Sequence, residues 1–116
     1  MTELVALLST GEGTWAQVSG IIKQGEWDNI ILIGSEFAKK FQIDKEHTFI
    51  EITQSRLVDL KKELEEKLRG KINGTEVALS IASGDGKEHM ALISALLAQP
   101  VGVRFTALTK EGIVFL

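Results

Sequence analysis

The chain has 116 residues, no cysteine, two histidines and a formal net charge of −3. This length fits one domain with one hydrophobic core, so we expect residues 1–116 to form a single domain. Without cysteine there are no disulfides, no thiolate catalysis and no cysteine-ligated zinc, and two histidines are too few for a histidine-rich metal site. We therefore expect no metal site and no cofactor.

The acidic balance argues against a general DNA-binding surface, because neutralising phosphates needs a basic face. It still allows one small anionic ligand held by a few groups. The first residues lack the basic stretch and apolar core of a signal peptide, and apolar runs such as IILI at 30–33 are too short to span a bilayer. We expect a cytoplasmic protein without membrane contact.

Hydrophobic periodicity predicts strands that alternate with helices. Short apolar or alternating runs predict strands at 3–9, 29–34, 47–53, 75–82, 102–108 and 112–116. Helical spacing predicts helices at 15–25, 35–41, 55–70 and 87–98, the second of them short and capped by Ser35. The turn TKEG at 109–112 predicts a hairpin between the last two strands.

The clearest helix is SRLVDLKKELEEKLRG at 55–70. Its apolar face should contain Leu57, Leu60, Leu64 and Leu68. Its exposed face offers two acidic–basic pairs spaced four residues apart, Glu63–Lys67 and Glu65–Arg69. Gly70 supplies a left-handed residue that ends the helix.

This order of elements predicts an α/β fold, because strand–helix–strand units form parallel sheets with right-handed crossovers. Strands that are apolar on both faces fit a sheet covered by helices on both sides. The sequence therefore predicts a small Rossmann-like, doubly wound parallel sheet. Its strand order should be about 3-2-1-4-5, with a C-terminal antiparallel hairpin.

Ligands of such sheets bind outside the carboxyl ends of the strands, at the point where the winding reverses between strands one and four. The two most glycine-rich loops follow these two strands: STGEGT at 9–14 and ASGDGK at 82–87. Glycine lets the backbone approach a ligand, and the next helix begins with free N–H groups that attract anions. We expect the binding site at these loops.

The first loop matches the dinucleotide pattern G-x-G-x-x-A in GEGTWA, residues 11–16. The acidic residue expected at the end of strand two is missing, because Gly34 and Ser35 stand there. Glu12 would repel a phosphate unless its side chain points away. The alternative is a tight strand–helix turn capped by Thr14 or Thr10.

The second loop resembles the end of a P-loop, but Ile81 and Glu88 replace the required glycine and hydroxyl. A lysine at a helix start is electrostatically unfavourable, so Lys87 fits better if an anion binds beside it. The alternatives are that Lys87 extends into solvent and that His89 packs as a neutral imidazole beside Met90.

No nucleophile elbow, Ser-His-Asp arrangement or metal cage is evident. The loop hydroxyls belong to Ser9, Thr10, Thr14 and Ser83. Lys87 and His89 have the chemistry to stabilise charge or move a proton. Such a set can cleave a bound phosphodiester by positioning a ribose hydroxyl for in-line attack, or it can only bind it. We name Lys87, His89 and Ser9 as the candidate catalytic residues.

A family resemblance rests on the first loop, on IILIGSE and FIEI in strands two and three, and on the Lys and His before MALISALLA. Over nearly the whole chain the sequence resembles the CRISPR-associated Rossmann fold (CARF) domain. The resemblance implies a homodimer that binds cyclic oligoadenylate across its two-fold axis, in CRISPR antiviral signalling. Some family members also cleave this ligand as ring nucleases.

Carried over to this chain, the resemblance implies a ligand-binding set in both loops. The set is Ser9, Thr10, Gly11, Gly13, Thr14, Ser83, Gly84, Asp85, Gly86, Lys87 and His89. The chain would be a stand-alone sensor, a signal-degrading enzyme or the sensor for a separate effector chain. The alternatives are a nucleotide- or dinucleotide-binding module and a non-enzymatic interaction protein of Rossmann-like fold.

Overall fold

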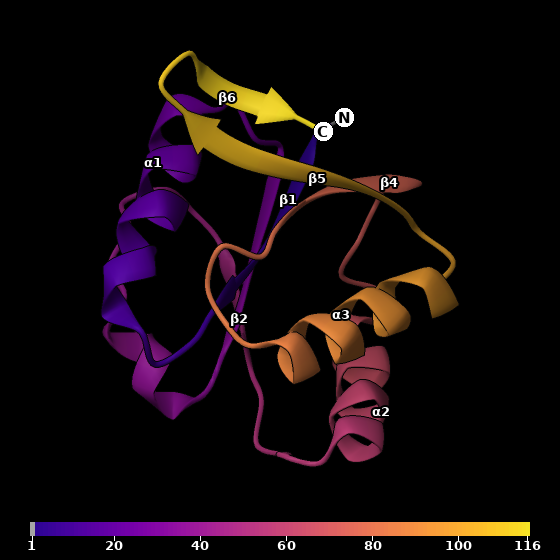
Figure 1. Ribbon diagram of the computed structural model, residues 1–116. Coiled ribbons are helices and arrows are strands. Elements are labelled where there is room, and N and C mark those ends of the chain that lie inside the picture. The colour runs from indigo at the N-terminus through magenta and orange to yellow at the C-terminus, as the bar shows by residue number, and fades with distance from the viewer. Residues whose placement is uncertain (1) are drawn as a thin grey trace.

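The computed structural model describes residues 2–116, and for residue 12 the backbone alone. Within this part of the chain, strands and helices alternate as the sequence predicts (Figure 1). The strands are β1 (Glu3–Leu8), β2 (Asn29–Gly34), β3 (Thr48–Glu51), β4 (Glu76–Ser80), β5 (Gly102–Thr109) and β6 (Gly112–Phe115). The helices are η1 (Glu12–Thr14), α1 (Trp15–Gln24), η2 (Glu36–Lys40), α2 (Leu57–Leu68) and α3 (Gly86–Ala98), of which η1 and η2 are 3-10 helices.

The six strands form one sheet in the order β3-β2-β1-β4-β5-β6. The first five are parallel, and β6 runs antiparallel to β5. The predicted α/β fold, the strand order 3-2-1-4-5 and the C-terminal hairpin are therefore confirmed. The winding reverses between β1 and β4, which pair directly, so the loops that follow these two strands leave the sheet side by side.

The core consists of two layers, one on each face of the sheet. β1 is buried along its whole length, because it is central and covered from both sides. Its residues alternate between the faces: Val5 and Leu7 face α2 and α3, whereas Leu4, Ala6 and Leu8 face α1. No helix within residues 2–116 is long and apolar enough to cross a membrane.

The predicted helix at 55–70 is α2, and two of its details differ from the prediction. Leu57 is 37% exposed, because the first residue of the helix lies outside the core layer formed by Leu60, Leu64 and Leu68. The pair Glu63–Lys67 forms at 2.9 Å, but Glu65 pairs with Lys61 at 2.6 Å. Arg69 already follows the last helical residue, so it lies out of register for Glu65.

Two further boundaries differ from the prediction. The segment at 35–41 is the short 3-10 helix η2, and within the described residues the Ser35 side chain makes no capping hydrogen bond. The third strand is shorter than expected and ends at Glu51. Gly70 has the predicted left-handed conformation, with φ of +78°.

Candidate functional site

The two glycine-rich loops meet at the carboxyl edge of β1 and β4, as the sequence predicts. The backbone N–H of Ser9 donates to the hydroxyl oxygen of Ser83 over 2.7 Å. Ser83 is only 1% exposed, so this bond lies inside the junction and not on its surface. The two loops are thus held together by a buried side chain, and their relative position is fixed before any ligand binds.

Glu88, which sequence reasoning did not place in the site, lies at the centre of this junction. Its Oε1 accepts from the Ser9 hydroxyl at 3.1 Å and from the backbone N–H of Asp85 at 2.9 Å. The Glu88 N–H in turn donates to Asp85 Oδ1 at 2.8 Å. These reciprocal bonds form a capping box at the start of α3. The spacing Asp-x-x-Glu is the sequence signal that identifies it.

This capping box changes the interpretation of Lys87. Asp85 and Glu88 place two carboxylates at the start of α3, where they offset the helix dipole and satisfy free N–H groups. Lys87 therefore lies between two acidic neighbours, and no bound anion is needed to explain it. A phosphate at this helix start would meet both carboxylates, so the second loop is the less favourable of the two anion sites.

His89 holds the second loop in place. Its ring is half-buried, and Nε2 lies 2.9 Å from the backbone carbonyl of Ser83. Because a carbonyl only accepts, Nε2 carries the hydrogen and the Nδ1 atom is left for other contacts. The ring turns toward the loop, and the neighbouring Met90 is 57% exposed.

The three candidate catalytic residues do not converge. Ser9 and His89 both bond to Ser83, through the backbone N–H of Ser9 and the ring of His89. Lys87 is exposed and takes no part in this network. It lines a hollow of about 190 Å³ together with Asp85 and Glu88 of the capping box, Ser35 after β2 and residues 53–55 after β3.

The glycines of the two loops differ in their structural roles. Gly84 has φ of +103°, and a Cβ there would clash with the Leu7 side chain, so the fold itself requires glycine. A Cβ added at Gly11, Gly13 or Gly86 would meet no described atom within 4 Å. The fold does not require these three glycines, and the space above them is open to a ligand.

The start of α1 is open only in the sense that no side chain caps it, because the 3-10 turn η1 leads directly into the helix. Thr14 is the N-cap residue, but its hydroxyl donates to the Gly11 carbonyl at 2.8 Å and does not accept from the helix. The predicted capping role of Thr14 is therefore wrong, and Thr10 is exposed. Trp15 anchors the loop, because its Nε1 donates to the Ser9 carbonyl at 2.8 Å. The expectation for the Glu12 side chain lies outside the described residues.

The carboxyl edge can thus hold an anion at the first loop, where the α1 N–H groups lack a side-chain acceptor from the N-cap. The hollow beside Lys87 is smaller than the roughly 300–1,000 Å³ of a complete small-molecule site. Within residues 2–116, no three His, Cys, Asp or Glu residues gather as metal ligands would.

Fold and edge geometry together define a Rossmann-like α/β protein. In fold it is similar to the crystal structure of an ethylated short-chain dehydrogenase/reductase from Veillonella parvula DSM 2008, with a TM-score of 0.53 and 19% sequence identity. The match covers 89% of this chain and 46% of that chain, so this chain spans less than half of its neighbour. No protein-family model and no curated protein matches the sequence.

Proposed function

We propose that this protein is a sensor that binds a cyclic oligoadenylate at the carboxyl edge of its sheet, between two copies of the chain. One observation carries the proposal. The uncapped start of α1 follows Gly11 and Gly13, which the fold does not require, and this loop is fixed to the second loop at the reversal point of the sheet. Such a backbone is suited to close approach by a phosphate.

Two copies answer in part the shortages of space and of positive side chains in one copy. The hollow at Lys87 is too small to enclose a nucleotide, and the net charge of the chain is −3. A dimer brings two first loops and two Lys87 side chains to one polyanion. The resemblance to CARF domains supports the same arrangement, in which the ligand lies on the two-fold axis.

The contacts favour binding over cleavage. The Ser9 hydroxyl is bonded to Glu88, the Nε2 atom of His89 is bonded to the Ser83 carbonyl, and within the described residues the Lys87 side chain makes no hydrogen bond to either group. General acid–base catalysis needs groups within hydrogen-bond reach of one reacting centre. We therefore expect the bound ring to remain intact, so that a separate effector chain reads the signal.

A dinucleotide-binding module is the second candidate. Its supporting observation is that GEGTWA follows β1 and leads into the open start of α1, where a pyrophosphate would bind. Against it, β2 ends in Gly34 followed by Ser35, where a ribose-binding carboxylate would stand. This candidate predicts binding of NAD by single copies of the chain.

Isothermal titration with cyclic tetra-adenylate, cyclic hexa-adenylate and NAD separates the candidates. The proposal predicts binding of a cyclic ligand at one ring per two chains, with unchanged ligand recovered after long incubation. Linear products would show that the protein is a ring nuclease and not only a sensor. Binding of NAD alone would favour the dinucleotide-binding module. No binding of any of the three would leave the interaction-protein alternative.

Matched variants locate the ligand within the protein. Gly11→Ala with Gly13→Ala adds methyl groups in open space, so we expect unchanged folding and about tenfold or more weaker binding. Gly74→Ala is the control. It also adds a Cβ without a clash, but at the amino edge of the sheet, so this variant should bind the ligand as the wild type does.

Lys87→Ala should weaken binding by about 1–3 kcal/mol if the lysine pairs with a phosphate. Lys71→Ala removes an equally exposed charge near the amino edge and should have no effect. If Lys87→Ala and the wild type bind the ligand with equal affinity, Lys87 does not contact the ligand.

A further inference from the structure

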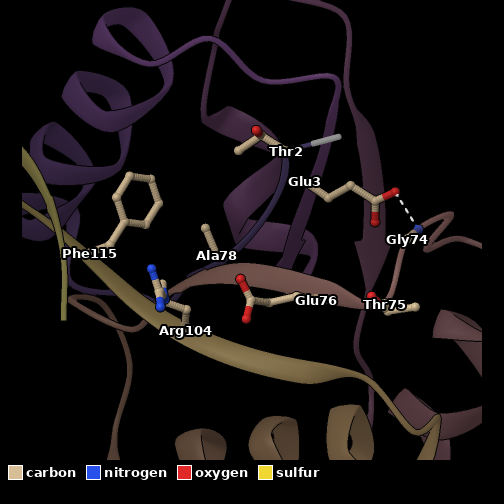
Figure 2. Close-up of a pocket in the computed structure, with 8 residues that line it drawn as sticks. All are labelled: Thr2, Glu3, Gly74, Thr75, Glu76, Ala78, Arg104 and Phe115. Carbon is tan, nitrogen blue, oxygen red and sulfur yellow. Dashed lines mark hydrogen bonds between the residues drawn. The ribbon is translucent and has the colours of Figure 1, made fainter.

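A polar hollow outside the loops lies at the amino edge of the sheet. It measures about 370 Å³, which is within the size range of small-molecule sites. Figure 2 shows its lining, in which Glu76, Ala78 and Arg104 come from β4 and β5 and Phe115 comes from β6. Since parallel strands have their amino ends at one edge, this hollow lies opposite the two glycine-rich loops.

Two opposite charges face this hollow. Arg104 is the register partner of Ala78, and Glu76 precedes Ala78 by two residues, so all three side chains share one face of the sheet. In Figure 2 the guanidinium and the carboxylate are directed into the same space. Both side chains are exposed, and neither is among the ion pairs that residues 2–116 form.

An apolar wall completes the hollow. The Phe115 ring is 48% exposed and lies beside Arg104 (Figure 2). It meets Trp27 edge to face at 6.3 Å between ring centroids, and Trp27 is itself fixed by a hydrogen bond from Nε1 to the Ile21 carbonyl. The Ala78 methyl group forms the floor. A planar or branched apolar group fits between this floor and the ring.

The rim of the hollow is held by a buried carboxylate. Glu3 is 1% exposed, and its Oε1 accepts from the backbone N–H groups of Asn73 and Gly74 at 2.8 and 3.0 Å. In Figure 2 its side chain turns toward Gly74 and away from Arg104. Glu3 therefore positions the loop before β4 through Oε1, while its Oε2 is buried without a partner among the described residues, and Glu76 is the exposed carboxylate of the hollow.

We propose that this hollow binds a small zwitterion, namely an α-amino acid with an apolar side chain. Its carboxylate would pair with Arg104, its ammonium group with Glu76, and its side chain would pack on Phe115 and Ala78. A simple anion would meet repulsion from Glu76 and a simple cation repulsion from Arg104, so charge complementarity selects a ligand with both signs. This site is independent of the nucleotide site at the opposite edge.

The test is a titration of the protein, followed by NMR or calorimetry, with three probes that differ in one charge each. L-Phenylalanine carries both charges, 3-phenylpropanoate lacks the ammonium group and phenethylamine lacks the carboxylate. We expect L-phenylalanine to bind about tenfold or more tightly than either analogue. Equal binding of all three probes, or no binding of L-phenylalanine, overturns the proposal.

Two variants assign the contacts. Arg104→Gln should weaken L-phenylalanine binding about tenfold or more and strengthen phenethylamine binding, because it removes the charge that repels a cation. Glu76→Gln should weaken L-phenylalanine binding to the same extent and strengthen 3-phenylpropanoate binding, because it removes the charge that repels an anion. Arg69→Gln and Glu66→Gln change the same charges on and just beyond α2 and should bind as the wild type does. Thermal unfolding confirms that each variant folds, and unchanged binding in both folded site variants contradicts the assignment.

Discussion

The backbone N–H of Ser9 donates to the Ser83 hydroxyl over 2.7 Å, across 74 residues of sequence. This one contact joins the loop after β1 to the loop after β4 at the place where the sheet reverses its winding. Because Ser83 is buried, this contact lies where the core meets the carboxyl edge of the sheet. It presents the open start of α1 in a fixed position.

Ser83→Ala should destabilise the fold by about 1–2 kcal/mol, because the Ser9 N–H loses its acceptor in a partly buried place. Urea unfolding at neutral pH measures the difference. Ser94→Ala is the control, since Ser94 is half-buried on α3 and makes no side-chain hydrogen bond within the described residues. The control should be neutral or slightly stabilising, because alanine favours a helix. A Ser83→Ala variant as stable as wild type would show that water replaces the contact.

Gly84→Ala and Gly86→Ala form a second matched pair, two residues apart in one loop. Gly84→Ala should destabilise by more than about 1 kcal/mol, because an alanine at φ of +103° is strained and its Cβ meets Leu7. Gly86→Ala should stabilise by about 0.5–1 kcal/mol, because it lies at the start of α3 with open space around it. Thermal or urea unfolding compares the two. Equal effects would contradict the distinction between these glycines.

The fold could be predicted from the sequence because its signals are local and agree with one another. The apolar strands, the leucine spacing of α2 and the glycine-rich loops each follow from neighbours along the chain. Errors arose where tertiary context decides. Leu57 fits the leucine pattern but lies beyond the core layer. Glu65 has a basic residue four positions away on each side, Lys61 and Arg69, and the structure pairs it with Lys61.

The sequence predicts that the two glycine-rich loops meet at one edge of the sheet, and the structure confirms this meeting but changes the interpretation of single residues. The sequence alone suggests that the charge of Lys87 at a helix start needs a bound anion. In the structure the carboxylates of Asp85 and Glu88 lie on either side of Lys87 in the chain and offset the helix dipole. No sequence pattern shows that Ser9 bonds to Glu88, because that contact depends on how two loops from distant parts of the chain approach. The open start of α1 likewise appears only once Thr14 is seen to bond backward, to Gly11.

Glu88→Ala should destabilise the protein by about 1–2 kcal/mol, because it removes one half of the capping box and the partner of the Ser9 hydroxyl. Glu88→Gln retains an acceptor oxygen and should lose less. Urea unfolding of both variants, with Glu66→Ala on the exposed side of α2 as the control, measures these costs. If Glu88→Ala and Glu66→Ala unfold alike, the capping box contributes nothing to stability.

The pH dependence of stability should depend in part on Glu63. Burial opposes its ionisation, but hydrogen bonds from Lys67 and from the backbone of Thr53 and Gln54 outweigh burial and lower the pKa to about 2. Because the folded pKa lies below the unfolded value of about 4.3, the stabilisation is fully present above about pH 5. It is lost as the pH falls toward 2.

Unfolding free energies measured from pH 6 to pH 2 test this contribution of Glu63 to stability. The wild type should lose more stability over this range than Glu63→Gln, because only the wild type has a carboxylate here that must be protonated. Glu66→Gln, on the same helix, should follow the wild type. Parallel curves for the wild type and Glu63→Gln would show that the Glu63 hydrogen bonds do not favour the charged form.

The central claim is that a nucleotide ligand binds at the first loop, at the carboxyl edge of β1. An NMR titration of labelled protein with cyclic tetra-adenylate tests it most directly, because each backbone amide reports its own surroundings. The account predicts saturable shifts at Gly11, Gly13 and Thr14, with Gly74 at the amino edge unaffected. A spectrum in which the first-loop signals stay fixed throughout the titration would contradict it.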